Sequence, residues 1–153
     1  MKRVLITGGS GFIGRKLVAE LRKRGDLVTV LTRNVARSKR ALPEGVRVAS
    51  WDPEKEGAWF DEVNVVDAVI HLAGEPVIRR WSDAGKRAIE RSRVESARLL
   101  VEAIGRAKNK PSALISASAI GYYGHREGSV ELDESAPPGS DFLAGVVKRW
   151  EEA

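Results

Sequence analysis

Cysteine is absent from this chain of 153 residues. Disulfide bonds, thiolate metal ligands and a cysteine nucleophile are therefore excluded. Histidine is scarce: His71 and His125 lie far apart in the sequence and have no carboxylate at metal-ligand spacing, so no metal site is predicted. We expect His71 to pack at the end of a strand instead.

Long apolar runs are also absent. None approaches the roughly 20 residues of a membrane span, and residues 4–6 run straight into glycines rather than forming the core of a signal peptide. We therefore expect a soluble, cytoplasmic protein without membrane contact. Hydrophobic residues at 42% and charged residues at 31% are close to globular averages, and the length suits one ordinary domain, residues 1–153.

Acidic residues are fewer than basic ones, which gives a net charge of +5. Such an excess raises the question of an anionic partner such as nucleic acid. In the helical stretches, however, the basic residues are interleaved with Glu20, Glu90 and Glu95, as on an ordinary solvated helix face. No aromatic-and-basic recognition motif is found, so nucleic-acid binding is not expected.

Strands and helices alternate along the chain. Apolar blocks typical of buried strands cover residues 2–7, 27–31, 46–51, 65–72 and 112–116. Helical periodicity covers residues 12–24, about 82–107 and 142–152, with one or two turns within residues 33–44. The apolar stripe of the first helix begins at Phe12 and Ile13. Because each strand is apolar in a block, the sequence predicts an α/β fold: a Rossmann-type doubly wound parallel sheet, covered on both faces, with strand order 3-2-1-4-5.

A glycine-rich turn joins the first strand to the first helix. Its residues are Gly8, Gly9, Ser10, Gly11, Phe12, Ile13 and Gly14. The early glycines allow a tight turn, Gly11 lets main-chain amides approach a phosphate, and Gly14 lets the helix pack closely on the strand. We predict that the turn binds the pyrophosphate of a dinucleotide; the alternative is a glycine-rich turn that binds nothing. No Gly-Lys-Ser/Thr follows, so a Walker-type triphosphate site is not expected.

The end of the second strand predicts which dinucleotide binds. Sites that prefer NAD usually carry an acid there for the ribose 2′-hydroxyl, whereas this chain has Thr32, Arg33 and Asn34. A guanidinium at this place pairs with a 2′-phosphate, and Arg37 and Lys39 add to the positive field. NADP(H) is therefore the preferred cofactor and NAD(H) the alternative; the other interpretation of Arg33 is a solvated surface arginine.

Several motifs further along resemble the extended and atypical short-chain dehydrogenase/reductase superfamily of the NAD-dependent epimerase/dehydratase type. The stretches are Trp-Asp-Pro at residues 51–53, His-Leu-Ala-Gly-Glu-Pro at 71–76 and Ser-Ala-Ser-Ala-Ile-Gly-Tyr-Tyr-Gly at 116–124. More narrowly, they are similar to the branch called epimerase family, or cell-division-inhibitor-like. The resemblance spans nearly the whole chain.

The resemblance implies further cofactor contacts. Thr32 and Arg33 would flank the adenosine ribose phosphate, and Asp52 would lie near the adenine. Arg93 would direct its charge toward the cofactor; the alternative is a surface salt bridge to Glu90 or Glu95. The residues that would line the cofactor after the fourth strand are Leu72, Ala73 and Gly74.

The resemblance is weaker at the catalytic residues. Ser118 stands where the family keeps a Ser or Thr that hydrogen-bonds the substrate carbonyl. Active relatives carry Tyr-x-x-x-Lys on the next helix, the lysine lowering the phenol pKa, but residues 142–151 contain no tyrosine. The one similar spacing joins Tyr122 to Arg126. Tyr122 or Tyr123 would then donate a proton to substrate, or else simply pack at the sheet edge.

Length is a second departure. Enzymes of this resemblance continue into further strands and a small substrate-binding region, so the fold is expected to be truncated before that region. The first functional hypothesis is an NADP(H)-dependent oxidoreductase or epimerase-like enzyme acting on a small carbonyl or nucleotide-sugar-like substrate. The alternative is a non-catalytic, cofactor-binding regulatory module. An exposed apolar sheet edge would favour a homo-oligomer.

Overall fold

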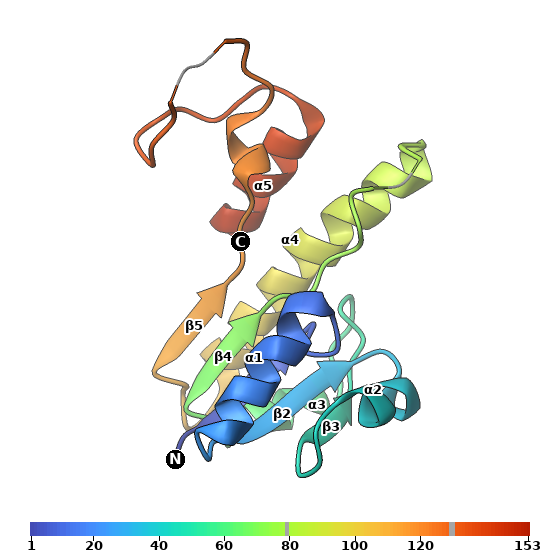
Figure 1. Ribbon diagram of the computed structural model, residues 1–153, viewed down its shortest axis with the longest axis vertical. Coiled ribbons are helices and arrows are strands. Elements are labelled where there is room, and N and C mark those ends of the chain that lie inside the picture. The colour runs from blue at the N-terminus through green and yellow to red at the C-terminus, as the bar shows by residue number, and fades with distance from the viewer. Residues whose placement is uncertain (79, 129–130) are drawn as a thin grey trace.

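A five-stranded parallel sheet forms the centre of the computed structural model, which describes residues 1–78, 80–128 and 131–153 (Figure 1). The strands are β1 (Arg3–Thr7), β2 (Leu27–Thr32), β3 (Arg47–Ser50), β4 (Ala68–His71) and β5 (Ala113–Ser116). Their spatial order is β3-β2-β1-β4-β5, which confirms the predicted order. All neighbours run parallel, so every strand ends at the same edge of the sheet.

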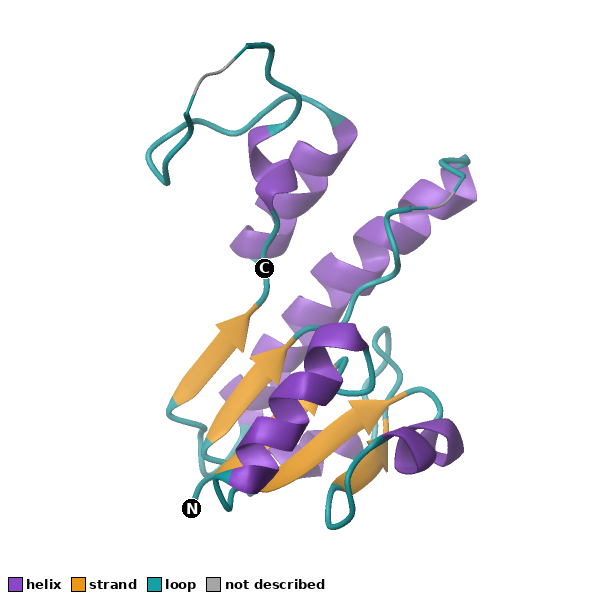
Figure 2. Cartoon of the chain, in the orientation of Figure 1, coloured by secondary structure: helices purple, strands orange, loops and turns teal. Residues whose placement is uncertain are grey.

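Helices cover both faces of this sheet (Figure 2). They are α1 (Phe12–Lys23), α2 (Val35–Ala41), α3 (Trp59–Val63), α4 (Asp83–Arg106), the 3₁₀ helix η1 (Ile120–Tyr123) and α5 (Phe142–Glu152). Helix α3 was not predicted, because a five-residue helix is too short for periodicity to be detected. No helix among the described residues is long and apolar enough to cross a membrane.

Alternate residues of β1 point into two separate apolar clusters. Val4 and Ile6 pack with Val18 and Leu21 of α1 on one face, whereas Leu5 packs with residues of α3 and α4 on the other. Strand β1 is therefore buried on both faces, which is why its sequence is a continuous apolar block.

The prediction of an apolar, buried stripe on α1 was wrong for the first turn of the helix. Phe12 and Ile13 are 82% and 68% exposed, and the buried positions are Gly14, Val18 and Leu21. Gly14 lies on the inner face because the first turn of the helix packs against the glycine-rich turn, and this directs the two preceding side chains outward.

The expectation of a sheet covered on both faces fails at β5. Leu114 and Ile115 are 39% and 55% exposed. The reason is the position of α5, which packs against η1 and α4 instead of lying on this strand. In Figure 1, α5 lies beyond the carboxyl end of β5.

Candidate functional site

The turn after β1 depends on a left-handed glycine. Gly8 has a φ of 70°, a conformation that a residue with a side chain rarely adopts. Its carbonyl oxygen accepts a hydrogen bond of 2.9 Å from the amide of Gly11, which closes the turn and begins α1. A Cβ at Gly8 would also lie 2.7 Å from the carbonyl carbon of Leu72, so the turn is pressed against the segment that follows β4.

Two further glycines permit close packing, in a different way from the one predicted. A Cβ on Gly14 would lie 2.2 Å from the Gly8 oxygen, so this residue packs α1 onto the turn itself and not onto a strand. Gly9 provides the contact with the sheet, because a Cβ there would lie 2.7 Å from Cγ2 of Val30 on β2. The prediction that Gly14 permits close helix packing holds, but its partner was wrong.

The amino end of α1 is electrostatically positive and uncapped. Gly11 is the N-cap residue, and within the described chain no side chain caps the helix and no acid lies in its first turn. The first main-chain amides therefore lack intrahelical partners and retain the partial positive charge of the helix end. Such an end is suited to a phosphate.

A groove of about 630 Å³ opens at this helix end, along the carboxyl edge of the sheet. Of the predicted cofactor residues, its walls contain Gly8, Ser10, Gly11, Thr32, Arg33, Leu72, Ala73 and Gly74. Its walls also contain Arg37, which was expected to add to the positive field. The structure thus brings the ends of three strands, β1, β2 and β4, to one groove, as expected for an open parallel sheet.

Other predicted cofactor residues do not line this groove. They are Gly9, Phe12, Ile13, Gly14, Asp52 and Arg93. Gly9 and Gly14 act through packing, whereas Phe12 and Ile13 are exposed. Asp52 is exposed and accepts a 3.0 Å hydrogen bond from the amide of Glu54.

Sequence reasoning also missed part of the groove wall. The additional residues are Arg15, Leu31, Asn34, Ser38, Ala41, Trp51 and Pro76. Arg15 directly follows the last glycine of the motif, a position from which a helical side chain points back toward the turn. Trp51 is buried beside the Trp59 and His71 rings, at centroid distances of 6.3 and 6.5 Å.

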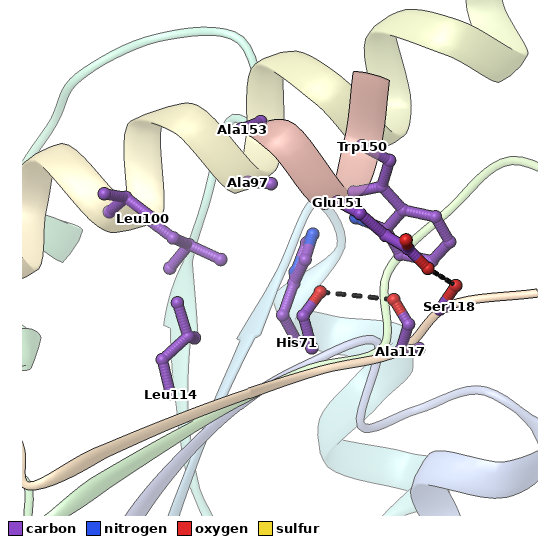
Figure 3. A pocket seen from close by; sticks show the side chains of 11 residues that line it. His71, Ala97, Leu100, Leu114, Ala117, Ser118, Trp150, Glu151 and Ala153 are labelled. Atoms are coloured by element: carbon purple, nitrogen blue, oxygen red, sulfur yellow. Dashed lines mark hydrogen bonds between the residues drawn. The ribbon is translucent and has the colours of Figure 1, made fainter. Parts of the chain in front are cut away.

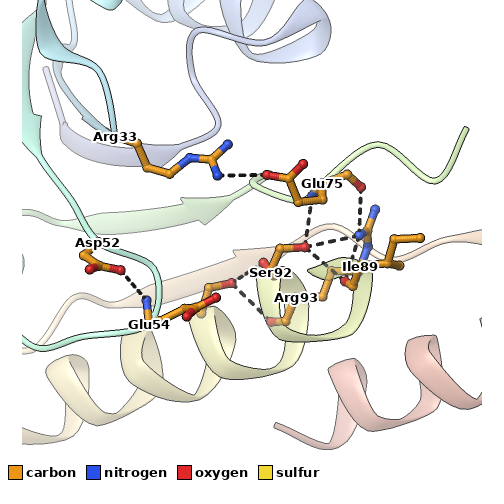
Figure 4. A network of polar contacts seen from close by, with 8 residues as sticks. Arg33, Asp52, Glu54, Glu75, Ile89, Ser92 and Arg93 are labelled. Carbon is orange, nitrogen blue, oxygen red and sulfur yellow. Dashed lines mark hydrogen bonds and ion pairs between the residues drawn. The ribbon is translucent and has the colours of Figure 1, made fainter. Parts of the chain in front are cut away.

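Arg33 is paired across the groove. Its Nη1 donates to a carboxylate oxygen of Glu75 at 2.8 Å, although the Arg33 side chain is 69% exposed (Figure 4). Arg33 follows β2 and Glu75 follows β4, so the ion pair joins the segments on either side of β1. Arg33 is therefore not a freely solvated residue. A ligand that binds its guanidinium would compete with the carboxylate of Glu75.

Arg93 supports the segment that carries Glu75. Its Nη1 donates to the carbonyl oxygens of Glu75 and Ile89 at 3.0 and 3.1 Å. Its guanidinium lies 5.5 Å from the ring centroid of Trp150 and would be 3.0 Å from a Cβ at Gly74. Partial burial lowers the pKa of Arg93, partly offset by the nearby carboxylate of Glu75.

The alternative of a surface salt bridge for Arg93 was wrong. Glu90 pairs with Arg149 at 2.8 Å, and Glu95 pairs with Arg98 at 3.7 Å. Arg93 instead holds the loop after β4, because it donates a hydrogen bond to the carbonyl of Glu75.

His71 is buried at the end of β4, as predicted. The Thr7 hydroxyl accepts from the Ala73 amide at 3.3 Å and lies 2.6 Å from His71 Nδ1, while Nε2 lies 3.1 Å from the Ser96 hydroxyl. Ser96 donates to the carbonyl of Ser92 at 2.7 Å. These roles fix a neutral imidazole that accepts at Nδ1 and donates at Nε2. Burial lowers the pKa of His71 to about 4.

Ser118 lies at a second cavity, of about 370 Å³, between α4, β5 and α5 (Figure 3). Its hydroxyl donates to the carboxylate of Glu151. The walls also include His71 and Trp150, whose ring centroids are 6.3 Å apart. Among the described residues, this cavity shares no wall residue with the groove, although His71 of the cavity directly precedes Leu72 of the groove.

Tyr122 packs in η1 against Tyr123, with ring centroids 5.3 Å apart. The Arg126 side chain donates to the carbonyls of Tyr123 and Pro137, each at 3.1 Å, and is therefore not positioned to act on the Tyr122 hydroxyl. Tyr122 lines neither cavity. No cluster of three metal-ligating side chains occurs in the part of the chain that the structure describes.

Comparison with known proteins relates this arrangement to a family. The chain is 38% identical, over 97% of its length, to the chloroplastic SDR39U1 homolog of Arabidopsis thaliana, an epimerase family protein. The human epimerase family protein SDR39U1, crystallised with NADPH, is 31% identical over 98% of this chain, with a TM-score of 0.76. MoeE5, solved with UDP-glucose and NAD, is 28% identical over 98% of this chain, with a TM-score of 0.78.

These relatives are longer. This chain covers 43% of the Arabidopsis protein, 48% of the human chain and 47% of MoeE5. It therefore spans less than half the length of each. Residues 4–144 match the family described as the NAD dependent epimerase/dehydratase family. The fold, the glycine turn at the strand ends and this match together show that the chain belongs to the NAD dependent epimerase/dehydratase family.

Proposed function

We propose that the groove binds NADP(H), with the diphosphate at the uncapped amino end of α1, beside Ser10 and Gly11, and the 2′-phosphate at Arg33. The observation that carries this proposal is the charge of the groove wall. Its charged members are Arg15, Arg33 and Arg37, and the nearby carboxylate of Glu75, which is not a wall residue, pairs with Arg33 alone among these three. Together with the uncapped end of α1, this wall matches an anion with charge at two separate positions.

The residues present fit such a ligand in shape as well as charge. Gly8, Gly11 and Gly14 leave space that a side chain would fill, and Cβ atoms there would lie 2.7, 3.1 and 2.2 Å from neighbouring backbone atoms. Without side chains at the turn, a phosphate can approach the amides closely. Leu72 and Ala73 would form the apolar wall on the other side of the groove.

The proposed reaction class is that of an oxidoreductase or epimerase acting on a carbonyl or nucleotide-sugar-like substrate. When bound, the nicotinamide would supply hydride transfer. The chain would contribute orientation through the turn, and Ser118 would hydrogen-bond a carbonyl once released from Glu151. The complexes of human SDR39U1 with NADPH and of MoeE5 with UDP-glucose and NAD support this class.

A second candidate is a cofactor-binding module without turnover. It is favoured by the hydrogen bond that ties Ser118 to Glu151 and by the lack of any tyrosine in α5. Incubation with NADP(H) and a set of carbonyl or nucleotide-sugar substrates distinguishes the two candidates, because only the enzyme forms product. A reductase lowers the NADPH absorbance, whereas an epimerase returns the cofactor unchanged and is detected by the epimer that it forms.

Calorimetric titration with NADPH, NADH and ATP tests the binding site itself. Trp51 lines the groove, so quenching of its fluorescence gives a second readout, absent in Trp51→Phe. Gly11→Leu would place a side chain at the exposed start of α1 and is expected to abolish NADPH binding. Gly105→Leu is the matched control, since this exposed helical glycine has nothing within 4 Å of its Cβ position. Unchanged NADPH binding in Gly11→Leu would refute the proposed site.

A further inference from the structure

The ion pair between Arg33 and Glu75 crosses the groove at the point where a 2′-phosphate would bind. Arg33 directly follows β2, and Glu75 lies four residues beyond the end of β4. These strands flank β1 on its two sides, so the pair spans the strand end from which the glycine turn starts. Figure 4 shows the two side chains pointing toward each other from the segments that follow β2 and β4.

The main chain of Glu75 is fixed independently of its side chain. Its amide donates to the Ser92 hydroxyl at 3.0 Å, and its carbonyl accepts from Arg93 at 3.0 Å. Both partners belong to α4, which packs on the sheet. A change at the Glu75 carboxylate therefore alters the charge beside Arg33 and leaves the donor and the acceptor of these two main-chain hydrogen bonds in place.

Arg33 differs from the other arginines of the groove. Within the described residues, Arg15 and Arg37 form no ion pair, whereas Arg33 is held by a carboxylate at 2.8 Å. A phosphate that pairs with this guanidinium must share it with that carboxylate or displace it, and in either case lies beside a like charge. A ribose 2′-hydroxyl, by contrast, can donate to the carboxylate, as it does to the acid of sites that prefer NAD.

We propose that Glu75 is a specificity-determining residue, whose carboxylate competes with a 2′-phosphate for Arg33 and lowers the preference of the groove for NADP(H) over NAD(H). This inference rests on the proposed cofactor site. Sites that prefer NAD carry an acid at the end of the second strand. This chain has no acid there, and Glu75, on the loop after β4, would take its place. Sequence inspection of the second strand alone cannot detect it.

Fragment titration tests this role directly. The probes are 2′,5′-ADP, which carries the 2′-phosphate, and 5′-AMP, which lacks it. Glu75→Gln is expected to tighten 2′,5′-ADP binding about threefold to fivefold at low ionic strength, the range for loss of one exposed charge interaction, and to leave 5′-AMP within about twofold. The NADPH/NADH affinity ratio should rise by a similar factor and the gain should shrink in high salt.

Two controls make the result specific. Glu62→Gln removes the partner of Arg47 at the opposite end of the sheet and should leave both affinities unchanged. In an Arg33→Gln background, Glu75→Gln should have no further effect on 2′,5′-ADP, because the competition acts through Arg33. Thermal unfolding verifies that each variant is folded.

The outcomes separate this inference from the proposed function. If wild type binds NADPH and Glu75→Gln leaves the fragment and dinucleotide ratios unchanged, or shifts both ligands equally, the role of Glu75 is refuted and the cofactor site stands. If neither dinucleotide binds the wild type or any variant, the cofactor site is refuted and this inference with it.

Discussion

The Thr7 hydroxyl lies 2.6 Å from Nδ1 of His71, and this bond joins the ends of β1 and β4 in the interior of the protein. The Thr7 oxygen also accepts from the amide of Ala73, a wall residue of the groove. The groove is thereby connected, through the imidazole, to Ser96 on α4. The network favours a neutral imidazole, because a proton on Nδ1 would displace the Thr7 hydroxyl hydrogen from its acceptor on the ring.

Stability is therefore expected to fall in mild acid. The pKa of His71 is about 4 in the folded chain against 6.5 for the ordinary residue, so the unfolded chain binds the proton more readily between these values. The contribution of His71 is complete above pH 6.5 and is lost as the pH falls toward 4, by about 3 kcal/mol in total. Urea unfolding at pH 7.5, 5.5 and 4.5 measures this loss.

Replacing the His71 side chain tests whether this residue causes the loss of stability in acid. His71→Gln should lower stability at pH 7.5 but flatten its dependence on pH between 6.5 and 4. His125→Gln, at an exposed histidine, is the control and should retain the wild-type slope. A His71→Gln variant with an unchanged slope would place the acid sensitivity in another group.

Gly14→Ala is expected to disrupt the turn. The added Cβ would lie 2.2 Å from the Gly8 oxygen and 2.7 Å from the Gly9 Cα, both backbone atoms that cannot rotate away. We expect a loss of about 2–3 kcal/mol in unfolding free energy and loss of NADPH binding. Gly105→Ala, in open space on α4, should instead raise stability by about 0.5–1 kcal/mol. Chemical unfolding and calorimetry measure both effects; wild-type stability in Gly14→Ala would contradict the close packing of Gly14 on the turn.

Gly8→Ala and Gly25→Ala separate backbone strain from steric conflict. Both glycines have a positive φ, of 70° and 87°. A Cβ at Gly25 meets nothing within 4 Å, so its substitution should cost only the strain, about 1–2 kcal/mol. At Gly8 the Cβ would also lie 2.7 Å from the Leu72 backbone, so the loss in unfolding free energy should be clearly larger. Equal losses in thermal or urea unfolding would show that the turn can move away from Leu72.

The sequence pattern predicts those structural features that depend on residues close together in the chain or on the periodicity of a single helix or strand. The strand order follows from apolar blocks separated by helices, and the glycine turn follows from its spacing between β1 and α1. The prediction for Phe12 and Ile13 was wrong because an apolar residue in the first turn of a helix fits the periodicity whether or not a neighbour covers it. The exposure of β5 likewise depends on where α5 packs.

Contacts between residues that are far apart in the sequence could not be predicted, for a different reason. Arg33 and Glu75 are 42 residues apart, and each has a plausible local role when considered alone. Only the parallel sheet, which ends β2 and β4 at the same edge, brings them together. Arg93 is similar, because the local ion pairs suggested by helical spacing are replaced by a contact with the loop after β4.

Arg93→Met provides the test of that contact. The substitution keeps an apolar side chain beside Trp150 but removes the donors to the Glu75 and Ile89 carbonyls. We expect a loss of about 1–2 kcal/mol in unfolding free energy and weaker binding of both NADPH and NADH, because the wall at Gly74 is no longer held. This pattern differs from that of Glu75→Gln, which should change the preference between the two cofactors.

The control for Arg93→Met is Arg98→Met, which removes an exposed arginine of the same helix that pairs with Glu95. It should change stability by less than about 0.5 kcal/mol and leave cofactor binding unaltered. Hydrogen exchange of the amide of Glu75 gives a local readout, since that amide is bonded to Ser92 and should exchange faster only when Arg93 no longer holds the adjoining carbonyl. Unchanged exchange in Arg93→Met would mean that Ser92 alone fixes the loop and that the guanidinium serves the packing of Trp150.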